Sequence, residues 1–214
     1  MMKNNSNILL LSILLIFEIA NSQTNYIEIF DTKKHVEEAT INKIKEKGFE
    51  IIYDNYVNNY FQVEKNSQRY LCDNQGNILQ LPVKNSIIQN PTKKGVIFTA
   101  DRSGNNPQSE NTSKCRNIQA FNLKGEKVEI KIIDLQNYYF AYGQTFITRN
   151  IFTPYGDFTT IHKEKDGNIY EGLLQDNGIL KFEANYDNIR QIGDKYICLK
   201  KGNLTQVYDL SKNV

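Results

Sequence analysis

The stretch that decides the fold runs from Tyr60 to Leu79 and reads YFQVEKNSQRYLCDNQGNIL. Apolar and polar residues alternate along Tyr60–Glu64, which predicts a half-buried β-strand. Asp73–Asn77 has the form Asp-x-x-Gly-x. An aspartate accepts hydrogen bonds from backbone amides a few residues further on, and glycine adopts the positive φ that such a turn requires. The stretch therefore predicts a β-hairpin that ends in a tight turn.

The same order of residues returns at the other end of the chain. The strand pattern recurs at Tyr196–Lys201, the turn pattern recurs at Asp209–Asn213, and Tyr53-Asp54-Asn55 recurs as Tyr186-Asp187-Asn188. Related turn signatures occur at Asp101–Asn105, Asn122–Glu126, Lys165–Asn168 and Asp176–Gly178. Two matched ends with degenerate material between them predict an array of hairpin units of roughly 25–45 residues.

The remaining patterns predict one helix and further short strands. Val36, either Thr40 or Ile41, and Ile44 have helical spacing in a segment with acids first and bases last. Gly48 follows, so a helix is expected over about 34–47. The other predicted strands are Ile78–Leu81, Lys127–Ile132, Tyr138–Tyr142, Phe146–Ile151, Phe158–His162, Ile169–Leu174, Ile179–Phe182 and Gln206–Tyr208. The predicted fold is mainly β, an array of β-hairpin repeats preceded by one short α-helix. The array is either an open repeat array or a small closed ring.

The N-terminus has the three parts of a secretory signal peptide. A basic start at Lys3 is followed by an apolar run from Ile8 to Phe17 and by the small residues of Ala20-Asn21-Ser22. The run is shorter than the roughly 20 residues that a transmembrane helix needs, so no stable membrane anchor is expected. We therefore expect cleavage before Gln23 and export to the periplasm, the cell surface or the medium. The chain divides into a signal peptide (1–22), an N-terminal segment with the helix (23–48) and a β-repeat domain (49–214).

Taken together, the apolar-Tyr-Asp start, the strand ending in lysine and the strand running into Asp-x-x-Gly-x resemble the WG β-repeat of exported bacterial proteins. The clearest copies are Phe49–Leu79 and Phe182–Val214, and only turn signatures match between about 95 and 180. Arg69-Tyr70 and Thr205-Gln206 stand where the family has its Trp-Gly pair. The resemblance implies a mostly β repeat domain and supplies no catalytic residues.

Composition excludes several classes of partner. The 214 residues carry a formal net charge of only +2, which predicts no nucleic-acid partner. The two histidines, His35 and His162, are predicted to be surface residues, and no Gly-x-Ser-x-Gly elbow supplies a nucleophile. Asp101–Asn105 offers one carboxylate beside an arginine, too few ligands for calcium. No catalytic, cofactor-binding or metal-binding residue is predicted.

Three cysteines are compatible with one disulfide in an exported chain. Cys72 and Cys198 occupy the first and last copies of the repeat pattern, so their pairing requires these copies to be neighbours, as in a closed ring. The alternative is that both are small buried residues. Cys115 falls in a polar stretch and is predicted to be a free thiol.

Two further segments are candidates for contact with a ligand. In Tyr138–Tyr142, alternation sends Tyr138, Phe140 and Tyr142 to one face of a strand and Tyr139 to the other, and core packing is favoured over an exposed aromatic surface. Thr99–Asn117 is predicted to be a long polar loop suited to variable contacts.

The predicted function is that of an exported, non-catalytic binding or scaffold protein with an unknown protein or glycan partner and no cofactor. The alternative is a secreted hydrolase acting on glycan or peptide. Glycoside hydrolysis would need two carboxylates about 5–10 Å apart in a cleft, and the sequence identifies no such pair.

Overall fold

The computed structural model describes residues 35–84, 86–102, 112–143 and 148–213, so the predicted signal peptide lies outside the described residues. Helix α2 (Glu38–Glu46) confirms the predicted helix over a shorter range. Thr40 and Ile44 are buried, and their spacing of four places them on one face of the helix, while Val36, also buried, precedes it and donates its N–H to Asp54 O. Gly48, with φ 77°, follows the helix and donates its N–H to Lys45 O, and the chain turns there into the first strand.

The first sheet contains the stretch Tyr60–Leu79. Its strand order is β1 (Glu50–Val57), β2 (Tyr60–Lys65), β3 (Gln68–Asp73) and β4 (Ile78–Leu79), all antiparallel. Asn58-Asn59 and Asn66-Ser67 connect the first three strands with φ angles between 48° and 69°. Positive φ at both positions is the type I′ geometry that matches the twist of paired strands. Phe61, Val63 and Cys72 pack against Ile44 of the helix.

The second sheet has nine strands. They are β5 (Ser86–Ile88), β6 (Ile97–Asp101), β7 (Thr112–Phe121), β8 (Lys127–Val128), β9 (Tyr138–Gly143), β10 (Asn150–Thr153), β11 (Gly156–Lys165), β12 (Asn168–Gln175) and β13 (Leu180–Tyr186). Their order is β13-β12-β11-β9-β7-β6-β5, with β10 on β11 and β8 on β7. The short 3-10 helix η1 (Leu135–Asn137) leads into β9. Tyr138 and Phe140 of β9 lie in the core with Phe98 and Ile161.

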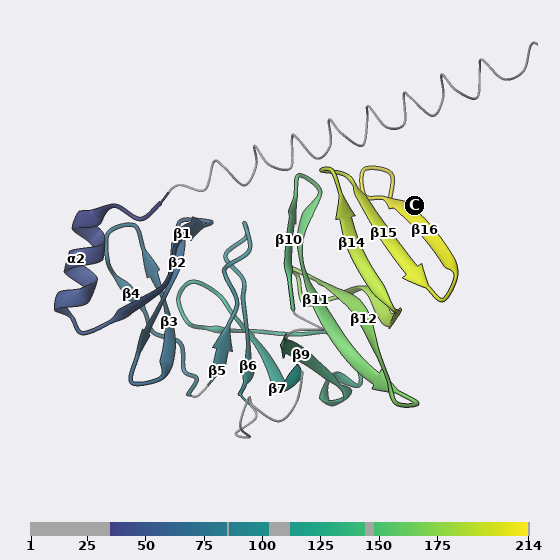
Figure 1. Cartoon of the computed structure of the whole chain (residues 1–214), viewed down its shortest axis with the longest axis horizontal. Coiled ribbons are helices and arrows are strands. Elements are labelled where there is room, and N and C mark those ends of the chain that lie inside the picture. The colour runs from purple at the N-terminus through teal and green to yellow at the C-terminus, as the bar shows by residue number, and fades with distance from the viewer. Residues whose placement is uncertain (1–34, 85, 103–111, 144–147, 214) are drawn as a thin grey trace, which may run out of the picture.

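The third sheet is formed by β14 (Asn188–Ile192), β15 (Tyr196–Lys201) and β16 (Leu204–Asp209). Ile189, Ile197 and Leu199 pack against Phe158 and Leu173 of the nine-stranded sheet. Figure 1 shows the first and third sheets at opposite ends of the molecule, with strands of the second sheet between them. The described strands form open sheets, so the small closed ring is the wrong alternative.

Four connections share one turn geometry. They are Asp73–Asn77, Thr92–Val96, Asn122–Glu126 and Gln175–Ile179. In each turn the first N–H donates to the fifth carbonyl, the fourth N–H donates to the first carbonyl, and the fourth residue is a glycine with φ 76–78°. Asp209–Asn213 is related, but Lys212 is its fourth residue and Asn213 has the positive φ. The Asp-x-x-Gly-x signature is thus confirmed as a turn at Asp73.

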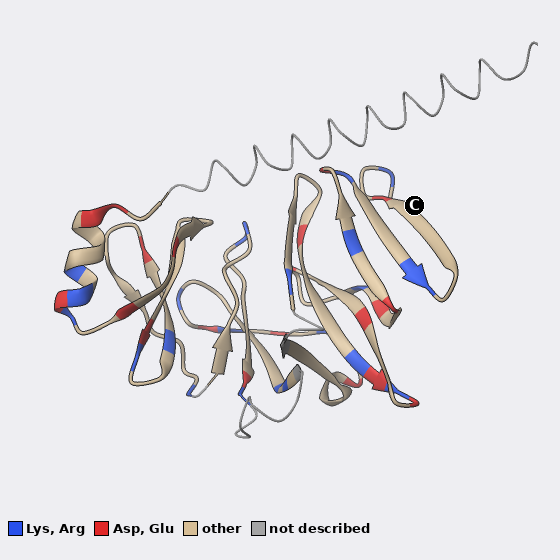
Figure 2. Cartoon of the chain, viewed as in Figure 1, with Lys and Arg blue, Asp and Glu red and all other residues tan. Residues whose placement is uncertain are grey.

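Charges of both signs alternate along the molecule. Figure 2 shows Lys and Arg interleaved with Asp and Glu over the drawn strands, in keeping with the net charge of +2. Among the described residues, no helix has the length and apolar character needed to cross a membrane.

Candidate functional site

The turn Thr92–Val96, between β5 and β6, is the centre of the candidate site. Thr92 Oγ1 accepts a hydrogen bond of 3.0 Å from the Val96 N–H, in the way that Asp73 accepts from Asn77. Gly95 supplies the positive φ of the fourth position. These bonds form within the turn itself, so Lys93 and Lys94 at its tip are free to contact other elements.

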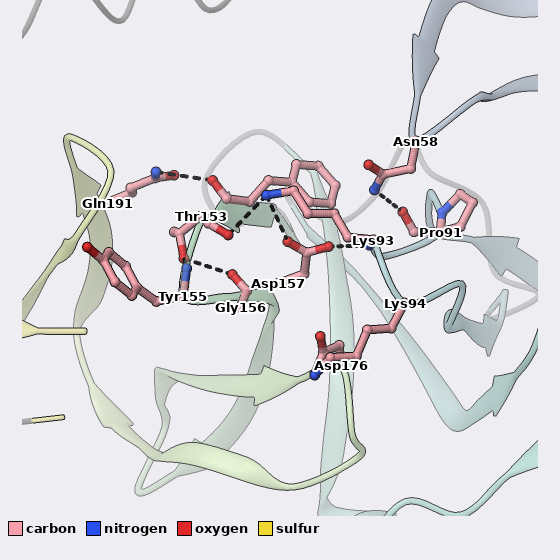
Figure 3. A network of polar contacts seen from close by, with 11 residues as sticks. Asn58, Pro91, Lys93, Lys94, Thr153, Tyr155, Gly156, Asp157, Asp176 and Gln191 are labelled. Atoms are coloured by element: carbon pink, nitrogen blue, oxygen red, sulfur yellow. Dashed lines mark hydrogen bonds and ion pairs between the residues drawn. The ribbon is translucent and has the colours of Figure 1, made fainter. Parts of the chain in front are cut away.

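Both lysines bind acids of the nine-stranded sheet (Figure 3). Lys93 donates its backbone N–H to Asp157 Oδ2, and its Nζ lies 3.0 Å from Thr153 O and 3.7 Å from Asp157 Oδ1. Lys94 Nζ lies 3.0 Å from Asp176 Oδ1. Asp157 and Asp176 belong to β11 and to the turn after β12. The turn therefore binds the β5–β6 connection to β11 and to the end of β12, which lie more than sixty residues later in the sequence.

Asp157 and Asp176 form a buried acidic pair that the sequence analysis missed. Their side chains are 1% and 6% exposed, and the Asp176 N–H donates to Asp157 O. The pKa of Asp157 is raised, mainly because the carboxyl is buried. The negative charge of Asp176 raises this pKa further, whereas the hydrogen bond and the charge of Lys93 lower it. Because each acid is bound by a lysine, the arrangement neutralises charge and holds elements together.

On the other side of the turn lies a pocket of about 420 Å³. Pro91, Lys93 and Gly95 form one wall, and the β1–β2 turn and the Asp73–Asn77 turn form the others. Asn58 Nδ2 donates to Pro91 O over 2.6 Å and so ties two of these walls together. Figure 3 shows Lys93 between Asp157 on one side and Pro91 with Asn58 on the other.

The lining of the pocket is polar but carries little free charge. Four side-chain amides contribute to it: Asn58, Asn59, Asn74 and Gln75. Asp73 also lines the pocket, but its Oδ1 accepts from Gln75 N at 2.9 Å and Asn77 N at 2.8 Å, and its Oδ2 accepts from Asn77 Nδ2 at 2.9 Å. Burial would raise the pKa of Asp73, but these hydrogen bonds outweigh it and the pKa is lowered.

Apolar surface completes the pocket. Tyr60, Pro91 and Leu123 line it beside the amide residues. Burial raises the pKa of Tyr60, and the nearby charge of Asp73 adds to this effect. Tyr60 therefore stays a neutral phenol at physiological pH, and the pocket combines an aromatic ring with neutral hydrogen-bonding groups.

A second polar cluster joins the nine-stranded sheet to the third sheet. Glu171 accepts two bonds of 2.9 and 2.8 Å from Arg149 Nη2 and one of 2.7 Å from the Ile189 N–H. His162 Nε2 lies 3.6 Å from Glu171 Oε1, and its ring stacks on Tyr139. The prediction of a surface His162 is wrong: β11 lies between β9 and β12, which leaves the side chain 0% exposed. Its buried surroundings fit a structural role at the sheet junction.

The other predicted positions have mixed outcomes. His35 is exposed as predicted, 3.4 Å from Asp54. Cys72, Cys115 and Cys198 are free thiols, and the Cys72–Cys198 pairing is wrong because β3 and β15 lie in sheets at opposite ends. The polar stretch assigned to Cys115 is strand β7, where the residue is buried.

Two segment predictions need correction or refinement. The predicted loop Thr99–Asn117 is wrong at both ends, which belong to β6 and β7, while residues 103–111 lie outside the described residues. Asp101 and Arg116 are partners in the backbone register of these two strands, so the polar residues at both ends of the predicted loop belong to the sheet. Tyr138, Tyr139 and Phe140 are all buried, so core packing is confirmed for both faces of β9. The described residues contain no group of three or more His, Cys, Asp and Glu able to hold a metal ion.

Comparison of the chain with protein-family models, with curated proteins and with solved structures finds no match.

Proposed function

We propose that this chain is an exported, non-catalytic binding protein whose ligand occupies the pocket between the Asn58-Asn59, Asp73–Asn77 and Thr92–Val96 turns. The observation that carries the proposal is the lining of this 420 Å³ pocket, to which four amide residues and Tyr60 contribute. Its volume lies within the roughly 300–1,000 Å³ of small-ligand sites. The charged residues of the lining already have partners within the protein, which suits recognition better than acid–base chemistry.

The alternative, a secreted hydrolase, receives less support. It needs two carboxylates facing a cleft, one of them able to donate or accept a proton. Asp157 and Asp176 are neighbouring acids, but they are buried and bound by Lys93 and Lys94. Neither acid lines the pocket. We therefore favour binding over hydrolysis.

We also propose that the scaffold is an open array of hairpin units. Three hairpins, β2–β3, β6–β7 and β11–β12, are each followed by a further strand (β4, β8 and β13), and the connecting turns are Asp73–Asn77, Asn122–Glu126 and Gln175–Ile179. The β15–β16 hairpin is followed by the related turn Asp209–Asn213. These equivalences support units that share geometry where their sequences have diverged. Relation to WG repeats is proposed on the sequence pattern alone.

Incubation with substrates tests the non-catalytic part of the proposal. The purified protein is mixed with neutral oligosaccharides and with peptides, and products are followed by chromatography and mass spectrometry. We expect every probe to be recovered intact. Turnover that disappears in the Asp157→Asn or Asp176→Asn variant, while the variant stays folded, would establish the hydrolase instead. Export is tested by N-terminal sequencing of the protein from the medium or periplasm, which should begin at or near Gln23.

A further inference from the structure

We propose that the pocket recognises a neutral carbohydrate, an inference that rests on the proposed binding function and names its ligand class. Three properties of the pocket carry it: the absence of an available charge among its described lining residues, the density of side-chain amides, and the construction of its walls from turns.

The first property excludes ionic ligands as the preferred class. Asp73 and Lys93 are the two charged residues of the lining. Asp73 uses both carboxylate oxygens within its own turn. Lys93 directs its ammonium group to Thr153 O and Asp157 Oδ1 at 3.0 and 3.7 Å. A charged ligand would compete with these partners for the same groups, and a neutral ligand would not.

The second property matches the chemistry of sugar hydroxyls. A side-chain amide offers two N–H donors and a carbonyl acceptor, and a hydroxyl group donates and accepts as well. Asn59, Asn74 and Gln75 line the pocket and are exposed, and their side chains are uncharged. Tyr60, which also packs on the Leu71, Ile88 and Ile97 cluster, lines the pocket as well. The C–H face of a sugar ring packs on aromatic surface of this kind. The lining therefore presents both kinds of surface that a pyranose presents.

The third property argues against an extended peptide. Peptides are commonly recognised by the addition of a strand to an exposed sheet edge, where backbone hydrogen bonds supply affinity. The walls of this pocket are the residues 58–60, 73–75, 91–93, Gly95 and Leu123, which belong to turns or to the first and last residues of strands. No run of strand backbone lines the space, so the pocket offers a peptide no sheet edge to which it could add a strand.

Asn59 provides a variant with a matched control. Asn59 and Asn66 are both exposed and both sit in two-residue turns with φ 69° and 52°, so Asn59→Ala and Asn66→Ala carry a similar backbone cost. Only Asn59 lines the pocket. Loss of its hydrogen bonds should weaken binding roughly three- to ten-fold, while Asn66→Ala should bind as the unaltered protein does.

The experiment titrates the purified protein with three sets of probes and follows ¹H–¹⁵N NMR shifts. The sets are neutral hexasaccharides (cello-, malto-, xylo- and chito-), oligogalacturonate as an anionic glycan, and an uncharged hexapeptide. We expect at least one neutral hexasaccharide to shift the NMR signals of the Asn59 and Gln75 side-chain amides. Asn59→Ala should weaken the binding of this probe, and Asn66→Ala should leave its affinity unchanged. Binding at these residues by the peptide or the anionic glycan alone overturns the ligand class and leaves the binding function standing. No shift at the pocket with any probe, or shifts that Asn59→Ala leaves unchanged, overturns both.

Discussion

Lys93 and Asp157, sixty-four residues apart in the chain, are joined twice: the Lys93 backbone N–H donates to Oδ2, and the Nζ lies 3.7 Å from Oδ1. Asp157 is almost completely buried, whereas half of the Lys93 side chain is exposed. The relationship holds the turn that forms one wall of the pocket against the nine-stranded sheet. Its loss should therefore affect both the stability of the fold and the shape of the pocket.

The Lys93→Met variant should lower the free energy of unfolding by about 2–3 kcal/mol, because Asp157 keeps a buried charge without its cation. The double variant Lys93→Met/Asp157→Asn should recover part of this loss, since the amide carries no charge. Urea denaturation measures both. Lys212→Met is the control, because the Lys212 side chain is exposed and lies 3.9 Å from Asp209 Oδ2, so its removal should cost less than about 1 kcal/mol. Equal losses in the two single variants would contradict the assigned role of Lys93.

Asp73 gives a prediction about pH. Its folded-state pKa is lowered because the hydrogen bonds from Asn77 and Gln75 outweigh the effect of burial. The contribution of such a carboxylate to stability is present above its unfolded pKa and is lost as the pH falls through its folded pKa. Asp73→Asn should therefore be less stable than the unaltered protein at neutral pH, by less than about 1 kcal/mol, and the difference should shrink below about pH 4. A difference that grows on acidification would contradict the assigned sign.

The first and last hairpins were predictable from sequence because their local rules agree. Alternation along Tyr60–Lys65, a two-residue turn and Asp-x-x-Gly-x all favour the same structure, and β2 and β3 follow. The turn Thr92–Val96 was missed although Thr92-x-x-Gly-Val obeys the same grammar. Threonine in the first position was not recognised as a substitute for aspartate. A search that accepted any short acceptor side chain there would have found it.

The site was less predictable because its partners are distant in sequence. No residue near Lys93 in the sequence indicates that Asp157 is its partner. The burial of Asp157 and Asp176 follows only from the packing of the Thr92–Val96 turn against them. His162 shows the same limit. Its neighbours Thr160 and Glu164 are polar, which favours a surface strand, but strands on both sides place it in the interior. Local patterns predict strands and turns, whereas the position of a strand within a sheet depends on contacts from the whole chain.

Gly172 tests the close approach of β12 and β13. A Cβ at this position would lie 2.7 Å from Ala184 N and 2.8 Å from Phe182 O, both backbone atoms. Gly172→Ala should cost at least about 2 kcal/mol, because the two strands must separate to admit the methyl group. Gly167→Ala is the control: its φ of 75° is unfavourable for alanine, but no atom lies within 4 Å of its Cβ, so only about 1 kcal/mol is expected. Thermal unfolding ranks the two variants, and a greater loss at Gly167 would contradict the packing argument.

The three thiols provide the last prediction. Cys72 and Cys115 are buried, and burial, together with the charge of Asp73, raises the pKa of Cys72 to about 12. Since the thiolate is the reactive form, neither residue should react with a disulfide reagent in the native protein at pH 8, and labelling should be slow and confined to the partly buried Cys198. Cys198→Ser should abolish native labelling. In denaturant without reductant, three thiols should react per chain, and one thiol would instead reveal a disulfide between two of them.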